Sequence, residues 1–206
     1  HLCFYGHQTA CESFQNENYF DPGGFSEYLR ITGRGVTDGT LKLPEDISYE
    51  QGAFIEPLGT VVRGWRAADV QPGDSILILG GGLVGLLYVK LARAKGVSLA
   101  VLTFEPHPIM VLRPETSPRR LSPFRVKVRR LRECGVEILY MLPFSTDFSK
   151  KTPENFVREV LVDGLGVHHV VVGHDYRFGK DRAGDAEFLV HAGEAMGFGV
   201  TEVSPI

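Results

Sequence analysis

The sequence predicts an α/β fold, in which a doubly wound parallel sheet of about five strands follows a small irregular N-terminal lobe. From residue 75 onward, short and almost wholly apolar stretches alternate with longer helical stretches. That alternation is typical of parallel strands that are buried on both faces. A glycine cluster directly follows the first apolar stretch, and the first 45 residues are rich in turn-forming residues. Both features fit the predicted lobe and sheet domain.

The elements of the sheet domain follow from the length and hydrophobicity of each stretch. Strands are at most about eight residues long, whereas helices need ten or more. We expect strands at 75–79, 99–104, 136–142, 168–173 and 198–203, and helices at 83–95, 123–134, 153–162 and 184–196. Right-handed crossovers between these strands produce the doubly wound arrangement. The expected domains are 1–69, the lobe with one helix, and 70–206, the sheet domain.

The segment before the sheet predicts one short strand and one helix. The stretch "GFSEYLRI" alternates as a strand does. Ser48 begins the helix, and Gln51 stands three residues later, where a capping-box partner belongs. The expected apolar face of this helix is formed by Ile55, Leu58, Val62 and Trp65.

Composition excludes several classes of partner. The 206 residues carry a net charge of −3, which gives no general attraction to nucleic acid or to acidic membranes. The basic run from Arg113 to Arg132 is interpreted as a solvated face. The longest apolar run, 75–89, is too short to span a bilayer. No signal peptide is recognised, and three cysteines do not form a disulfide framework, so we expect a cytoplasmic protein. The oligomeric state stays open.

The glycine cluster predicts a nucleotide-binding turn. Gly80, Gly82 and Gly85 fit the pattern G-x-G-x-x-G between a strand and a helix. Gly80 permits the tight turn, Gly82 lets a pyrophosphate approach the backbone, and Gly85 lets the helix pack against the strand. Glu105 lies 20 residues beyond Gly85, where a carboxylate binds the ribose hydroxyls of NAD and repels the 2′-phosphate of NADP. The alternatives are a glycine turn without a ligand and a Glu105 that merely ends its strand.

Residues 1–96 resemble the zinc-dependent medium-chain dehydrogenases, in the branch of sorbitol and threonine dehydrogenases. The stretches "DPGGFSEYLRI" and "LPEDISYEQGAFIEPLGTVVRGWRAADVQPGDSILILGGGLVGLLYVKLARAKG" carry this resemblance. It implies a Rossmann-like domain that binds NAD. Cys3 and Cys11 resemble the third and fourth ligands of the structural zinc site, and Glu56 resembles the glutamate near the catalytic zinc. Two thiolates do not complete a tetrahedral site, so we expect an incomplete and empty zinc site.

Residues 99–206 resemble a second family, the FMN adenylyltransferase (FAD synthetase) module of bifunctional riboflavin kinases. The stretches "VLTFEPHP", "SPFRVKVRRLRECGVEILYMLPF" and "VVGHDYRFGKDRAGD" carry this resemblance. It implies transfer of AMP from ATP to FMN with Mg²⁺. His107 and Asp175 follow strands at the ligand-binding edge, where Asp175 suits a metal on the phosphates. Arg177 and Arg182 suit phosphate oxygens. The alternatives are a loop histidine between prolines, a turn aspartate and two surface arginines.

The two resemblances meet near residues 95–99, so the chain is interpreted as a composite. The glycine turn occupies the place of the second family's His-x-Gly-His, and its Ser-Ser-Thr-x-x-Arg would come after Ile206. We therefore expect a catalytically incomplete FAD synthetase-like protein that acts on small-molecule nucleotides. One alternative is an NAD-binding fragment of a zinc-dependent polyol dehydrogenase. Another is a chimeric structural hybrid without activity.

Overall fold

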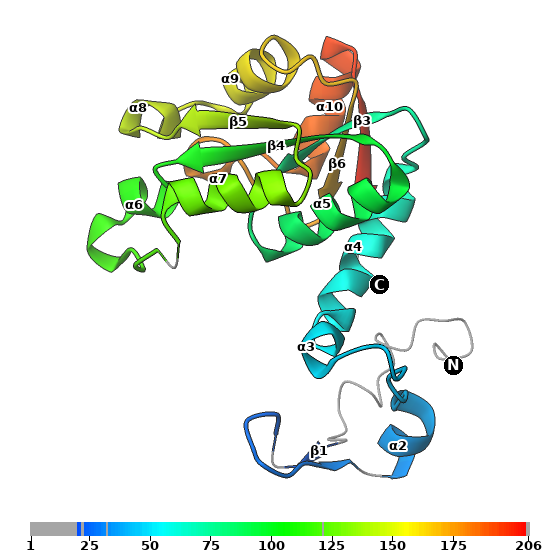
Figure 1. Cartoon of the computed structure of the whole chain (residues 1–206). Coiled ribbons are helices and arrows are strands. Elements are labelled where there is room, and N and C mark those ends of the chain that lie inside the picture. The colour runs from blue at the N-terminus through cyan, green and yellow to red at the C-terminus, as the bar shows by residue number, and fades with distance from the viewer. Residues whose placement is uncertain (1–19, 22, 32, 121, 205–206) are drawn as a thin grey trace. The chain divides into compact units, whose positions relative to one another are not determined.

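The chain folds into two units, one that ends at Phe54 and one that begins at Ile55. The computed structural model describes residues 20–21, 23–31, 33–120 and 122–204. Cys3 and Cys11 therefore lie outside the described residues. Figure 1 shows the chain, with the second unit coloured from cyan to red.

The described part of the first unit holds little regular structure. Strands β1 (Phe20–Asp21) and β2 (Arg30–Ile31) pair antiparallel, and helices α2 (Gly33–Gly39) and α3 (Tyr49–Gly52) follow. The strand predicted for "GFSEYLRI" is wrong except for its last two residues, because residues 24–27 form bends. Both residues of β2 are exposed, and a hairpin without a buried face is barely stable. Helix α2 was not predicted.

One predicted helix divides into α3 and α4 (Ile55–Ala68). The predicted capping box is confirmed, because Ser48 and Gln51 each accept a hydrogen bond from the other's backbone N–H. The break follows from Pro57, which lacks an N–H and would clash with the carbonyl of residue 53 in a continuous helix. In α4 the proline stands in the first turn, where it is tolerated.

The apolar face of α4 lies further along the helix than predicted. Ile55 and Leu58 are 56% and 38% exposed, whereas Trp65 is buried as expected. The buried positions are Val61, Gly64 and Trp65. This face of α4 contacts α5, β6 and β7 within the second unit.

The second unit is a parallel α/β structure, so the predicted fold class is confirmed at that level. Its strands are hydrogen-bonded as three plus two, in the orders β3-β4-β5 and β6-β7. The bounds are β3 (Ser75–Leu79), β4 (Ser98–Glu105), β5 (Ile138–Pro143), β6 (His169–Gly173) and β7 (Gly199–Val203). No ladder joins the two sheets in the described part of the chain, where the sequence led us to expect one sheet.

Helices fill the connections between these strands. They are α5 (Leu83–Lys95), α6 (Pro108–Leu112), η3 (Pro114–Thr116), α7 (Phe124–Glu133), α8 (Thr146–Ser149), α9 (Pro153–Phe156), η4 (Val157–Val162), η5 (Lys180–Arg182) and α10 (Ala186–Met196). The bounds predicted for α5 are confirmed. The helix predicted over 153–162 begins as α9 and continues as the π-helix η4.

Two hydrophobic clusters form the core. The first joins Trp65 of α4, Val89 and Ala92 of α5, Leu99 and Val101 of β4, Leu131 of α7, and Val97. Leu99 and Val101 point to one face of the sheet because alternate residues of a strand do. That face is therefore covered by α5 and α7, which lie along β4 in Figure 1.

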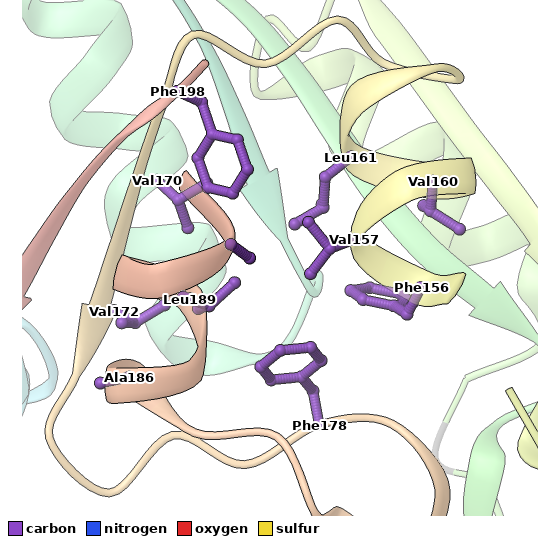
Figure 2. Close-up of a cluster of buried hydrophobic side chains, with 11 residues drawn as sticks. Phe156, Val157, Val160, Leu161, Val170, Val172, Phe178, Ala186, Leu189 and Phe198 are labelled. Atoms are coloured by element: carbon purple, nitrogen blue, oxygen red, sulfur yellow. The ribbon is translucent and has the colours of Figure 1, made fainter. Parts of the chain in front are cut away.

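The second cluster belongs to the C-terminal part of the unit. Figure 2 shows Val157 and Leu161 of η4 turned toward Val170 of β6, Leu189 of α10 and Phe198. Val160 of η4 belongs to the same cluster. Phe178 closes the cluster beside Phe156, and their ring centroids are 5.6 Å apart. Leu142 and Phe148 pack against it from the side of β5.

No helix in the described ranges has the length and the apolar composition that a membrane span requires.

The contact between α4 and α5 generates a stability prediction. A Cβ built on Gly64 would lie 1.9 Å from the hydroxyl of Tyr88. We expect Gly64→Ala to lower the free energy of unfolding by about 1–3 kcal/mol, the usual cost of overpacking. Gly59→Ala in the same helix meets nothing within 4 Å, and it should raise that free energy by about 0.5–1 kcal/mol. Urea denaturation measures both. Tyr88→Phe should partly rescue Gly64→Ala, and equal effects of the two alanines would contradict this packing.

Candidate functional site: the glycine loop and the carboxyl edge of the sheet

The glycine loop, residues Gly80–Gly82, leaves β3 at the carboxyl edge of the three-stranded sheet. Gly80 has φ +103°, a conformation that favours glycine, and its N–H donates to the carbonyl of Leu102 over 2.8 Å. A Cβ on Gly85 would lie 2.0 Å from the carbonyl oxygen of Gly80. Gly85 is thus required for the close approach of α5 to the strand, as the sequence predicted.

The backbone of the loop is accessible at Gly82. Gly82 is exposed, and a Cβ built on it would meet nothing within 4 Å. It occupies the N-cap position of α5, where no side chain caps the helix. The first N–H groups of a helix carry positive partial charge and suit anions. A nucleotide at this turn stays a prediction.

Glu105 lies at the end of β4 and forms an ion pair. Its carboxylate is 2.7 Å from Arg120, and about 30% of each side chain is exposed. The Arg120 guanidinium also contacts the sulfur of Met110 in α6, at 3.3 Å from Nε. The sequence placed Glu105 at this edge but did not indicate that Arg120 would neutralise it. The preference for NAD stays a prediction, and this cation would weaken the repulsion of a 2′-phosphate on which that prediction depends.

Lys127 of α7 brings a second cation to the same edge. Its ammonium donates a hydrogen bond to the hydroxyl of Thr103 over 2.7 Å. Thr103 is 5% exposed and lies near the end of β4. Burial lowers the pKa of Lys127, the Glu105 carboxylate opposes this shift, and Arg120 adds to it.

The interpretation of 113–132 as a solvated face is therefore wrong for Arg120 and Lys127. Both side chains turn back to the sheet, because Glu105 and Thr103 supply partners there. The helical spacing of Lys127, four residues before the buried Leu131, was the signal that it lies near the sheet.

His107 caps the helix that follows β4. Its Nδ1 accepts a hydrogen bond from the backbone N–H of Ile109 at 3.3 Å, so the neutral ring carries its proton on Nε2. The side chain is exposed. His107 thus lies two residues beyond Glu105 at the carboxyl edge, with one ring N–H available as a donor.

Asp175, Arg177 and Arg182 lie in the loop after β6. Asp175 and Arg177 are exposed, and Arg177 donates to the carbonyl of Tyr176 over 2.8 Å. Burial raises the pKa of the neighbouring Tyr176. Asp181 and Arg182 have φ of +55° and +59°, so two successive residues adopt left-handed conformations. No hydrogen bond or ion pair joins this loop to Glu105, His107 or the glycine loop among the residues that the structure describes.

Metal ligands do not gather in the described part of the chain, which contains no group of three or more His, Cys, Asp or Glu residues able to hold an ion. Two surface hollows, of about 270 and 490 Å³, also lie away from the glycine loop. The smaller is lined by Gly96 and Ser98 at the opposite edge of the sheet, and the larger by Ile55 and Leu58 of α4. Neither supports a ligand at the carboxyl edge.

Comparison with known proteins assigns the family. The family model for FAD synthetase matches residues 87–206. The chain belongs to the FAD synthetase family. The match begins inside α5, before the point near 95–99 where the sequence resemblance placed the join.

Curated relatives of this FAD synthetase family member are bifunctional enzymes. The chain is 38% identical over 109 residues to the riboflavin kinase/FMN adenylyltransferase of Escherichia coli K12, which covers 53% of this chain and 35% of that protein. It is 44% identical over 105 residues to the Pseudomonas fluorescens protein of the same name, covering 51% and 33%. The chain therefore spans about a third of the length of these relatives.

Solved dehydrogenases share the fold, as the resemblance to medium-chain dehydrogenases implied. An Escherichia coli CFT073 short chain alcohol dehydrogenase complexed with NADH superposes with a TM-score of 0.55 at 14% identity, covering 98% of this chain and 56% of that one. Galactitol-1-phosphate dehydrogenase from Escherichia coli gives 0.53 at 18% identity, covering 89% and 50%. At these identities the likeness concerns the fold alone.

The packing of Gly85 generates a prediction about the loop. We expect Gly85→Ala to lower the free energy of unfolding by about 3 kcal/mol, at the upper end of overpacking effects, because the clash is with backbone. Gly82→Ser adds a side chain in open space at an N-cap, which serine favours, and should change that free energy by less than about 0.5 kcal/mol. Thermal or urea denaturation compares them. A Gly85→Ala variant as stable as the wild type would contradict the close approach of α5.

Proposed function

We propose that this chain is a nucleotide-binding member of the FAD synthetase family that takes ATP and FMN but transfers AMP slowly. The observation that carries the proposal is the family match over residues 87–206, which contains His107, Asp175, Arg177 and Arg182. In this proposal Asp175 binds Mg²⁺ on the phosphates, and the two arginines pair with phosphate oxygens. His107 donates a hydrogen bond from Nε2 to the bound nucleotide.

Slow transfer is proposed because of the first strand–helix turn. The resemblance implies a His-x-Gly-His at this turn, and residues 80–85 read Gly-Gly-Gly-Leu-Val-Gly instead. Phosphoryl-type transfer depends on positioned groups that neutralise charge as it develops. A turn of glycines and aliphatic side chains offers backbone N–H groups to a bound phosphate. It has no polar side chain that could neutralise the charge that develops on the oxygen of the leaving group.

A direct assay tests this proposal. With ATP, Mg²⁺ and FMN, we expect FAD to form well below about 1 s⁻¹, the low end of ordinary enzyme turnover. ATP with Mg²⁺ at 100 times its dissociation constant should still stabilise the fold by about 2.7 kcal/mol. Chromatography of FAD and thermal unfolding measure the two quantities. Sustained turnover above 1 s⁻¹ would refute slow transfer, and no stabilisation by ATP would refute nucleotide binding.

Two variants, the second with a matched control, locate the ligand. His107→Asn keeps a good N-cap for α6 and removes the ring, so loss of ATP stabilisation would report on the ligand and not on the helix. Asp175→Asn should weaken binding of ATP with Mg²⁺, whereas Asp163→Asn, at an exposed aspartate elsewhere, should not. If Asp163→Asn weakens binding as much as Asp175→Asn does, the role of Asp175 is wrong.

A second candidate function is NAD binding at the same loop, as in a dehydrogenase-like module. The close packing of Gly85 on Gly80 favours it, since dinucleotide-binding turns require that approach. A purely structural hybrid would bind neither ATP nor NAD, so the same unfolding measurement with each nucleotide separates the three functions.

The Glu105–Arg120 ion pair generates a prediction for this second function. An unpaired carboxylate about 4 Å from a 2′-phosphate would cost about 4 kcal/mol before screening, and Arg120 offsets much of that cost. We expect the wild type to bind NAD less than about ten-fold more tightly than NADP. Arg120→Met should widen that ratio by leaving Glu105 uncompensated. Paired titrations by calorimetry give both ratios, and a wild-type ratio above 100 would show that Arg120 does not shield Glu105.

A further inference from the structure

We propose that Lys127 is the cation that binds a phosphate group of the ligand at the glycine loop. The ligand class is a molecule with two or more linked phosphates, such as a nucleoside triphosphate or a dinucleotide. This inference rests on the proposed nucleotide binding, because the bound nucleotide would supply these phosphates.

The position of Lys127 supports this role. A Cβ built on Gly81 would lie 2.8 Å from Cε of Lys127 and 3.4 Å from its ammonium nitrogen. The absence of a side chain at Gly81 therefore makes room for the lysine. The hydrogen bond to Thr103 holds the ammonium at 2.7 Å from the hydroxyl oxygen. Lys127 thus reaches from α7 to the middle residue of the loop.

The charge around Lys127 supports the same role. The loop and the first turn of α5 contain no charged side chain, so a cation for a phosphate has to come from another element. The nearby carboxylate of Glu105 already pairs with Arg120. Two cations thus face one carboxylate at this edge, which leaves a net positive charge.

The hydrogen bonding of the ammonium leaves capacity for a ligand. Within the described residues, Lys127 has one hydrogen-bond partner, the neutral hydroxyl of Thr103. An ammonium has three N–H donors, so two remain. Burial lowers the pKa of Lys127, and the carboxylate of Glu105, which pairs with Arg120, opposes this shift. A phosphate beside the ammonium would supply an anion that pairs with Lys127 directly.

A purely structural lysine is the competing explanation. In that case Lys127 would only satisfy the buried hydroxyl of Thr103, and anions would not affect it. The two explanations differ in what happens when phosphate is added, so the tests use inorganic pyrophosphate, which presents linked phosphates without a base or a sugar.

The first test compares charge-matched variants. We expect Lys127→Met to weaken the calorimetric affinity for pyrophosphate at least ten-fold and Lys127→Arg to restore part of it. Lys95→Met removes the same charge at the far end of α5 and should leave the affinity unchanged. Equal affinity of Lys127→Met and wild type, or an equal loss in Lys95→Met, overturns the inference. If ATP still stabilises the wild type in that event, the proposed function stands.

The second test uses the unaltered chain and so does not depend on a variant that folds. Acetic anhydride modifies lysine amines, and peptide mass spectrometry reports the rate at each lysine. We expect pyrophosphate to slow modification of Lys127 at least five-fold and to leave Lys95 unchanged. Modification of Lys127 at the same rate with and without pyrophosphate, or failure of the wild type to bind pyrophosphate, overturns the inference even if ATP binds elsewhere.

Discussion

The parallel ladder between β3 and β4 is the interaction on which the rest of the structure depends. It pairs Ser75 with Ser98 and continues to Leu79 with Leu102, and the N–H of Gly80 then donates to the carbonyl of Leu102. This register sets the glycine loop beside Thr103. A slip of one residue would turn Leu99 and Val101 away from α5 and α7 and put Ala100 and Leu102 of the opposite face in their place.

The same ladder explains how the second unit combines segments from both sequence resemblances. β3 and α4 lie in the dehydrogenase-like part, and β4 and α7 lie in the FAD synthetase-like part. Trp65 and Leu131 nevertheless belong to one buried cluster. Ile76 and Ile78 of β3 pack against the same cluster, so the core continues from one part into the other. The family match that begins within α5 agrees with this continuity.

The sequence predicted those parts of the fold that local patterns determine. The strands of the second unit were visible as short apolar runs, and the bounds of α5 were visible because Gly82 precedes the helix and Gly96 follows it. The first unit was not, because "GFSEYLRI" alternates correctly but has no surface on which to bury one face. Lys127 was missed for a related reason. A lysine within a basic run is ordinarily interpreted as solvent-exposed. The contacts of Lys127 with Thr103 and Gly81 join residues that are far apart in the sequence, so they become visible only in the folded structure.

The positive charge at the carboxyl edge of the three-stranded sheet comes from outside the glycine loop. In the proposed site the turn itself supplies backbone N–H groups, and the cations come from α7 and from the segment before it, through Lys127 and Arg120. A lysine is a compact point charge on a flexible stem, which suits attraction of a phosphate more than fixed geometry along a reaction path. Binding tolerates that flexibility, whereas group transfer loses rate when a stabilising group is displaced by about 1 Å. A glycine turn whose cation comes from another element is therefore consistent with the proposal of a site that holds nucleotide phosphates and transfers AMP slowly.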